Sequence, residues 1–170
     1  NWVLSTGGGY TDNWAITSAA PTGSYSSGLG AISSTSGGNY ALFDSDALGS
    51  TGDNQWAHLT MANGLNCTNY GTVNLQFIEN YRKFYDSTIV YVSTDNFATS
   101  KRYVLHEAYA NNDASGNGAV VNLDISAVAA GKSNVKVRFT FRSTQNMSTQ
   151  AGWGYAWEID DVCFIGVGPG

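Results

Sequence analysis

Hydrophobic and polar residues alternate along several segments of the chain. Apolar residues occupy every second position of residues 135–142 and nearly every second position of residues 73–81. A period of two residues indicates a β-strand with one face buried in a core. Other segments rich in β-branched and aromatic residues predict strands at residues 39–43, 87–94, 101–107, 120–125 and 152–165. No segment keeps a helical period of 3.6 residues, and only residues 124–131 are compatible with one short helical turn.

The predicted strands are separated by polar segments rich in Gly, Ser and Asn, notably residues 22–38 and 110–118. About ten strands at this spacing predict an all-β fold, namely an antiparallel β-sandwich of the jelly-roll type with two packed sheets. The length of 170 residues fits one domain, which we expect to span residues 1–166. Residues 167–170 are interpreted as the start of a linker or a C-terminal tail.

Composition narrows the class of protein. The net charge is −5, and charged residues make up only 12% of the chain, about half the usual share. Basic residues are few and scattered, which argues against a nucleic-acid partner. No apolar run is long enough to span a membrane. A surface made polar by Gly, Ser, Thr and Asn is typical of extracellular β-proteins, so we predict a secreted or cell-surface module, cut from a larger protein.

Acidic residues lie inside the last predicted strand, where Glu158, Asp160 and Asp161 follow Trp157 and precede an apolar run. A buried carboxylate without a partner is costly, so these acids need a counter-charge or hydrogen-bond donors. Strand alternation places Asp161 on the face opposite Asp160.

Two further acids, Asp44 and Asp46, follow the apolar segment 40–43. Calcium takes six to eight oxygen ligands, and Asp44, Asp46 and Asp161 would supply three carboxylates from two distant segments. We therefore predict a Ca²⁺ site at these three residues, with Asp160 close by. In the alternative interpretation, Asp44 and Asp46 are turn residues that bind the local backbone.

Aromatic residues suggest a ligand surface. Trp153 and Tyr155 share strand parity with Trp157, and with Trp14 and Trp56 they would form a stacking platform for sugars or for another apolar partner. Trp153 and Tyr155 are the candidate ligand-binding residues. Core packing is the alternative, because it explains most aromatic residues in strands.

The residues that could carry catalysis form no recognisable set. His58 and His106 both lie in predicted strands, and neither belongs to a metalloprotease or serine-hydrolase motif. No pattern connects the glutamates into the acid pair of a glycosidase. We therefore predict that the chain is not an enzyme.

Cys67 and Cys163 are the only cysteines. One disulfide between them is compatible with a secreted chain, and two buried free thiols are the alternative. The sequence leaves this choice open, because only the distance between the two residues decides it.

Four segments carry a resemblance to a known family. Residues 39–46, 65–70, 85–95 and 157–162 are similar to the MAM-like jelly-roll modules, which include the cleaved adhesin domains of gingipain-type proteins. The most specific parts are the V-x-V-S-T-D strand at Val90–Asp95 and the W-x-I-D-D-V strand at Trp157–Val162. Such modules occur in large secreted proteins of Bacteroidota.

The resemblance implies two antiparallel sheets, a structural Ca²⁺ and a role in adhesion or in carbohydrate or protein binding. Asp44, Asp46 and Asp161 match the acidic positions expected near that ion, with Asp160 close by and Asp12 as a weaker match. We expect a non-catalytic, calcium-stabilised extracellular module that binds a glycan or a cell-surface protein. The alternatives are a structural subunit of a surface filament or stalk, bound to copies of itself or to neighbouring domains, and an accessory domain of a secreted peptidase or glycosidase.

Overall fold

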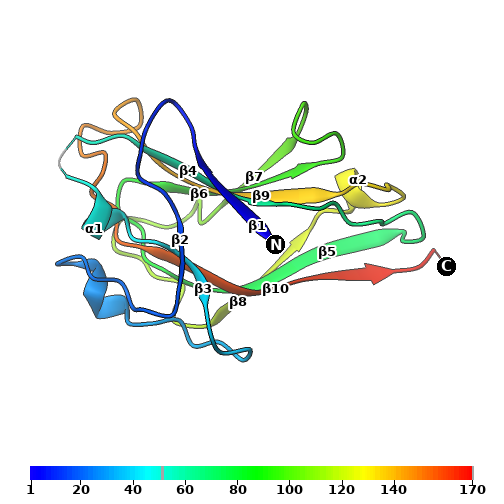
Figure 1. The fold of residues 1–170 in the computed structure, drawn as a ribbon, viewed down its shortest axis with the longest axis horizontal. Coiled ribbons are helices and arrows are strands. Elements are labelled where there is room, and N and C mark those ends of the chain that lie inside the picture. The colour runs from blue at the N-terminus through cyan, green and yellow to red at the C-terminus, as the bar shows by residue number, and fades with distance from the viewer. Residues whose placement is uncertain (51, 170) are drawn as a thin grey trace.

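Two five-stranded antiparallel sheets form the protein, shown as a computed structural model that describes residues 1–50 and 52–169 (Figure 1). The first sheet has the strand order β1-β4-β9-β6-β7 and the second the order β2-β3-β10-β5-β8. The strands of the first sheet are β1 (Trp2–Thr6), β4 (Gln55–Met61), β9 (Lys136–Ser143), β6 (Ser87–Ser93) and β7 (Lys101–Leu105). Those of the second sheet are β2 (Ala15–Thr17), β3 (Tyr40–Phe43), β10 (Trp157–Val167), β5 (Thr72–Tyr81) and β8 (Ala119–Asp124). The predicted all-β sandwich with two packed sheets is confirmed.

Side chains at alternate strand positions fill the space between the sheets. Val137, Phe139 and Phe141 of β9 are fully buried, as the period of two residues predicted. The ring of Phe141 stacks on Phe43 of the second sheet at a centroid distance of 4.4 Å. Trp157 at the start of β10 is also fully buried. This aromatic core joins the two sheets, and it lies close to the end of the molecule where the candidate site is found.

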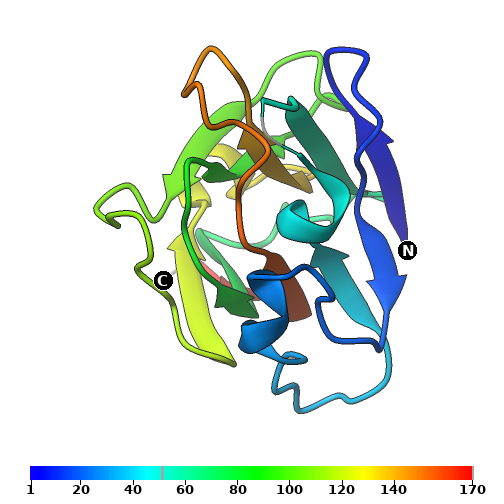
Figure 2. The same cartoon turned by 90° about the vertical axis from the view of Figure 1, so that its left-hand side faces the viewer.

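Three short helical segments connect the strands: η1 (Ser26–Leu29), α1 (Ser45–Leu48) and α2 (Ser126–Ala129). The last lies inside the segment 124–131, where a short turn was predicted. The Asp44 carboxylate caps α1 by accepting a hydrogen bond from the backbone N–H of Ala47 at 3.2 Å. Figure 2 shows η1 and α1 together at one end of the sandwich.

The last strand is shorter at its start than predicted. Residues 152–156 form no strand, and β10 begins at Trp157. A β-bulge then interrupts its pairing with β5 between Asp160 and Cys163, and Asp161 adopts a φ of 50°. The strand continues to Val167, one residue beyond the expected limit of the domain.

A long loop, residues 18–39, packs on the outer face of the second sheet, at the bottom of Figure 1. Ile32 from this loop forms a small apolar cluster with Tyr40, Leu42 and Ala156. Beneath the loop, the fully buried Glu158 accepts hydrogen bonds from the backbone N–H of Ile32 at 3.0 Å and from Asn80 Nδ2 at 2.6 Å. Burial raises the pKa of Glu158 to about 7.

The two cysteines are not bonded to each other, so the disulfide interpretation is wrong. Cys67 is buried against the core between the sheets, whereas Cys163 is exposed on β10 beyond the bulge. The alternative of two buried thiols is therefore correct for Cys67 alone. In the part of the chain that the structure describes, no helix is long and apolar enough to cross a membrane.

Candidate functional site

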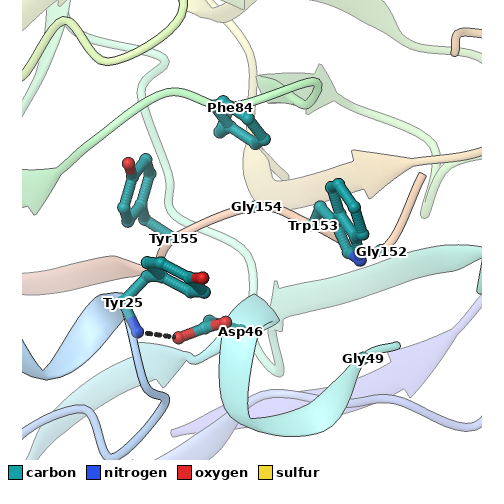
Figure 3. Close-up of a pocket in the computed structure, with 8 residues that line it drawn as sticks. All are labelled: Tyr25, Asp46, Gly49, Phe84, Gly152, Trp153, Gly154 and Tyr155. Carbon is teal, nitrogen blue, oxygen red and sulfur yellow. Dashed lines mark hydrogen bonds between the residues drawn. The ribbon is translucent and has the colours of Figure 1, made fainter. Parts of the chain in front are cut away.

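An aromatic cleft of about 320 Å³ lies at the end of the sandwich that carries α1 and η1 (Figure 3). Its lining residues come from four separate segments of the chain: Tyr25, Asp46, Gly49, Phe84, Gly152, Trp153, Gly154 and Tyr155. Both candidate ligand-binding residues, Trp153 and Tyr155, are among them. The strand parity used to pair them is wrong, because they lie in an irregular segment, yet the structure places both on the same cleft.

Two buried glycines hold Trp153 at the surface. Gly152 has a φ of 82°, a conformation that favours glycine, and a Cβ there would lie 2.5 Å from the carbonyl oxygen of Ser50. A Cβ on Gly154 would lie 2.6 Å from Ser45 Oγ and 2.9 Å from Phe141. The backbone thus lies directly against the core, and the Trp153 side chain between the glycines remains 43% exposed.

Tyr155 is fixed from three sides. Its hydroxyl donates a hydrogen bond to Asn112 Oδ1 at 2.7 Å, and the guanidinium carbon of Arg82 lies 4.5 Å from its ring centroid. The edge of Phe84 packs against the same ring at 5.7 Å. Contacts of this kind hold an aromatic ring in one orientation before any ligand binds.

Tyr25 lines the cleft next to Tyr155 and is 74% exposed (Figure 3). The carboxylate of Asp46 accepts hydrogen bonds from the backbone N–H groups of Tyr25 at 2.5 Å and of Ser26 at 2.9 Å (Figure 3). Both bonds end on Oδ2. Among the described residues, none donates a hydrogen bond to the second oxygen, Oδ1, which lies on a cleft-lining side chain.

Asp44 ties the same loop to α1. One oxygen accepts from the backbone N–H of Thr22 at 2.7 Å, and the other from Ser26 Oγ at 2.6 Å. The backbone N–H of Ala47 also donates to this carboxylate, so both oxygens of Asp44 accept hydrogen bonds from uncharged groups. Backbone binding was the alternative interpretation of Asp44 and Asp46, and the structure has this arrangement, with donors that also come from a loop about 20 residues earlier.

Asp160 and Asp161 lie elsewhere and share one loop. Asp160 accepts hydrogen bonds from Ser34 Oγ and Ser36 Oγ, and Asp161 from the backbone N–H and hydroxyl of Thr35. Regular strand alternation would place Asp160 and Asp161 on opposite faces of the sheet. The β-bulge interrupts this alternation, so both side chains bind the same loop.

The four acids do not fit one calcium ion. Ile159 pairs with Ala41, and Trp157 pairs with Phe43. Asp161 therefore lies near the start of β3 and Asp44 follows its end, a separation of about 13 Å along the strand. In residues 1–50 and 52–169, no three His, Cys, Asp or Glu side chains converge on a possible metal position. Calcium binding by the protein stays a prediction.

The other tryptophans do not belong to the cleft. Trp157 is fully buried and donates from Nε1 to Glu79 Oε2 at 2.9 Å, and Trp14 is 4% exposed. Trp56 lies on β4 of the first sheet. Core packing, the alternative for the aromatic residues, is therefore correct for Trp157 and Trp14. The lining residues Tyr25 and Phe84 were missed, because each reaches the cleft from an irregular segment with no local pattern.

Ionisable groups also meet between the sheets, away from solvent. His106 Nε2 pairs with Glu79 Oε1 at 2.7 Å, and the Tyr81 hydroxyl donates to Asp86. Burial raises the pKa of Asp86 to about 6. These groups satisfy one another inside the core and join β5 to β6 and β7, which is a structural role.

The comparisons with known proteins agree on the fold. No family model and no curated protein matches the chain. The K1 cleaved adhesin domain of Lys-gingipain from Porphyromonas gingivalis W83 superimposes with a TM-score of 0.57 at 18% identity, covering 98% of this chain and 91% of that one. TmCBM61, solved in complex with beta-1,4-galactotriose, gives a TM-score of 0.55 at 13% identity, covering 98% of this chain and 88% of that one.

A third structure, the enzymatically active domain of tailspike protein 4 of bacteriophage CBA120, gives 0.56 at 13% identity and covers 98% of this chain but 19% of that one. The chain thus has the β-sandwich fold found in carbohydrate-binding modules and cleaved adhesin domains. The resemblance inferred from the sequence is confirmed at the level of the fold.

Proposed function

We propose that the protein is a non-catalytic carbohydrate-binding module and that the aromatic cleft binds a glycan. Trp153 and Tyr155 are the stacking residues, with Tyr25 next to Tyr155 (Figure 3). The observation that carries the proposal is the position of Trp153, a large apolar side chain kept 43% exposed by two glycines packed on the core. An exposed aromatic side chain with a fixed backbone loses little conformational entropy when it binds a ligand.

The cleft has the size and composition expected of a ligand site. Its volume of about 320 Å³ lies at the lower end of the range for small-molecule sites. This size supports binding of one or two sugar rings, or of the end of a glycan chain. The apolar faces of sugar rings would lie on Trp153 and Tyr155, and the unused Oδ1 of Asp46 would accept a hydrogen bond from a sugar hydroxyl.

TmCBM61 supports this proposal through its similar fold and its bound galactotriose. The Lys-gingipain adhesin domain supports an adhesive role, in which the glycan belongs to a cell surface and the module is secreted or surface-attached. The same cleft would serve an accessory domain that holds a secreted peptidase or glycosidase near its substrate. The proposal needs no calcium at Asp44, because that carboxylate is satisfied by hydrogen bonds.

A glycan array with the whole chain tests the proposal. We expect binding to a small set of related neutral glycans, lost when Trp153 is replaced by alanine. Absence of binding to every glycan at high protein concentration would overturn it.

A further inference from the structure

Charge is divided between the two sheets. The strands of the first sheet contain five basic residues and no Asp or Glu, although the chain has 8 Lys and Arg against 13 acids. The five are Lys101, Arg102, Lys136, Arg138 and Arg142. The strands of the second sheet contain acids and no Lys or Arg; these acids are Glu79, Asp124, Glu158, Asp160 and Asp161. The protein as a whole is acidic, yet the charged residues in the strands of its first sheet are all Lys or Arg.

Most of these basic side chains lie on the outer face. Val137, Phe139 and Phe141 point into the core, so Lys136, Arg138 and Arg142 point outward from β9. By the same alternation Arg102 points outward from β7, because Tyr103 and Leu105, at the other alternate positions of the strand, pack against the core. We call the outward side chains of Arg102, Lys136, Arg138 and Arg142 the basic face.

Aromatic residues and a hydroxyl hold two of the guanidinium groups in place. The guanidinium carbon of Arg138 lies 4.1 Å from the ring centroid of Phe97, and its Nε donates to Thr60 Oγ1 at 2.9 Å. The guanidinium carbon of Arg142 lies 4.6 Å from the ring of Trp56. Among the described residues, no group accepts a hydrogen bond from the Nη atoms of either arginine. The stacking reduces the entropy lost on binding an anion.

None of these cations forms an ion pair with a carboxylate of the described residues. Within the described part of the chain, the only ion pair is His106 with Glu79, so no Lys or Arg lies within 4.0 Å of a carboxylate. The Nε atoms of Arg142 and Trp56 are buried and have no hydrogen-bond partner among the described residues. Such donors are costly to leave unpaired, so no hydrogen bond within the described residues offsets the burial of the Arg142 guanidinium.

His58 lies beside Arg138 on the same face of the first sheet. Its Nδ1 hydrogen-bonds with Thr140 Oγ1 at 2.7 Å. Burial and the nearby charge of Arg138 lower its pKa to about 4. His58 is therefore neutral at neutral pH and adds no charge to the basic face.

The spacing of the basic face suits an extended chain. Lys136, Arg138 and Arg142 lie along one strand, about 7 and 14 Å apart, so the line is about 20 Å long. Tyr91 pairs with both Arg138 and Arg102, which places Arg102 two strands away from β9, about 10 Å. A linear polyanion lying along β9 would meet three cations, with a fourth at its side.

We propose that the basic face binds an acidic polysaccharide, with its carboxylate or sulfate groups paired to Arg138, Arg142 and Lys136. This site is separate from the aromatic cleft and does not depend on the function proposed for it. A polysaccharide fits better than a nucleic acid, because Phe97 and Trp56 are engaged by guanidinium groups and not available for base stacking.

Affinity electrophoresis of the whole chain through gels containing a polysaccharide tests the proposal. The probes are polygalacturonate for carboxylates, heparin for sulfates and a neutral galactan as the control, each at about 50 and 200 mM salt, a range over which ionic binding weakens strongly. We expect retardation by at least one acidic polymer that weakens with salt. The double variant R138Q/R142Q should lose at least about tenfold in affinity, since each lost charge-assisted pair is worth about 1.5–3 kcal/mol.

Three further variants guard against misinterpretation. Lys132→Gln removes one charge from an exposed turn outside the basic face and should bind as the unmodified chain does. Arg102→Gln changes an exposed side chain and should weaken binding even if the double variant does not fold. Trp153→Ala should bind the acidic polymer normally, whatever it does to the glycan of the cleft.

Three results would overturn the proposal: no retardation by either acidic polymer at low salt, an equal loss in Lys132→Gln and R138Q/R142Q, or tighter binding of single-stranded DNA than of both polymers.

Discussion

The hydroxyl of Tyr155 donates a hydrogen bond to Asn112 Oδ1 at 2.7 Å, and this bond joins the segment before β10 to the loop between β7 and β8. Asn112 adopts a φ of 76°, so it tolerates a conformation that few residues other than glycine and asparagine accept. The bond crosses 43 residues of sequence. It fixes the ring that we assign to stacking on the ligand.

Tyr155→Phe removes this hydrogen bond and keeps the ring. We expect glycan affinity to fall by about threefold to tenfold, because an intramolecular hydrogen bond contributes about 0.5–1.5 kcal/mol. Titration calorimetry with a glycan found on the array measures the effect. Asn112→Gly removes the same bond and tolerates the positive φ, so it should give the same loss, and the double variant should lose no more than either single variant. Additive losses would show that the two residues act separately.

Gly154→Ala tests whether the backbone lies against the core as described. The new Cβ would meet Ser45 Oγ at 2.6 Å and Phe141 at 2.9 Å. We expect a loss of about 1–3 kcal/mol in the free energy of unfolding, measured by urea denaturation. Gly28→Ala is the matched control, because nothing lies within 4 Å of a Cβ at that position. Equal stability of the two variants would contradict the packing of this segment.

Stability should depend on pH through Glu158. Burial raises its pKa from 4.5 to about 7, so the folded state binds the proton more tightly than the unfolded chain. The stabilisation is fully present below about pH 4.5 and is lost as the pH rises through about 7, by at most about 1.4 kcal/mol per pH unit. Glu158→Gln lacks this titration. The difference in unfolding free energy between the two proteins should therefore change between pH 4.5 and 7, and a constant difference would exclude a raised pKa.

Asp44→Ala separates the two interpretations of the acidic motif. The substitution removes the helix cap and the bonds to Thr22 and Ser26, so we expect a loss of at least about 1–2 kcal/mol. The loss should be the same in calcium and in EDTA, because hydrogen bonds to neutral donors need no metal. A loss seen only in calcium would mean that Asp44 is an ion ligand.

The sandwich could be predicted because alternation reports local burial. Residues 135–142 were expected to form a half-buried strand, and β9 covers Lys136–Ser143. The same rule failed from residue 152 onward. Gly152 and Asp161 both have positive φ, and a bulge shifts the pairing register after Asp160. Side chains alternate between the two faces only where the strand is regular. The alternation therefore could not predict that Asp160 and Asp161 bind the same loop.

The candidate site was only partly predictable for a related reason. Trp153 and Tyr155 were singled out because they are aromatic residues near an acidic strand, and both lie on the cleft. Tyr25 reaches the cleft through a bond from its backbone to Asp46, 21 residues away. Such a contact leaves no local signal in the sequence. The separation of Asp44 from Asp161 likewise follows from strand pairing, which the sequence does not reveal.

The central claim is that Trp153 binds a glycan, and titration calorimetry of two matched variants tests it most directly. Trp153 and Tyr70 are 43% and 42% exposed, and Tyr70 packs against Gly166, near the far end of β10 from the cleft. With a glycan found on the array, Trp153→Ala should weaken binding by at least about tenfold, since a stacked tryptophan contributes about 2 kcal/mol or more. Tyr70→Ala should bind as the unmodified protein does. Unchanged affinity in Trp153→Ala, with its fold intact, would contradict the account.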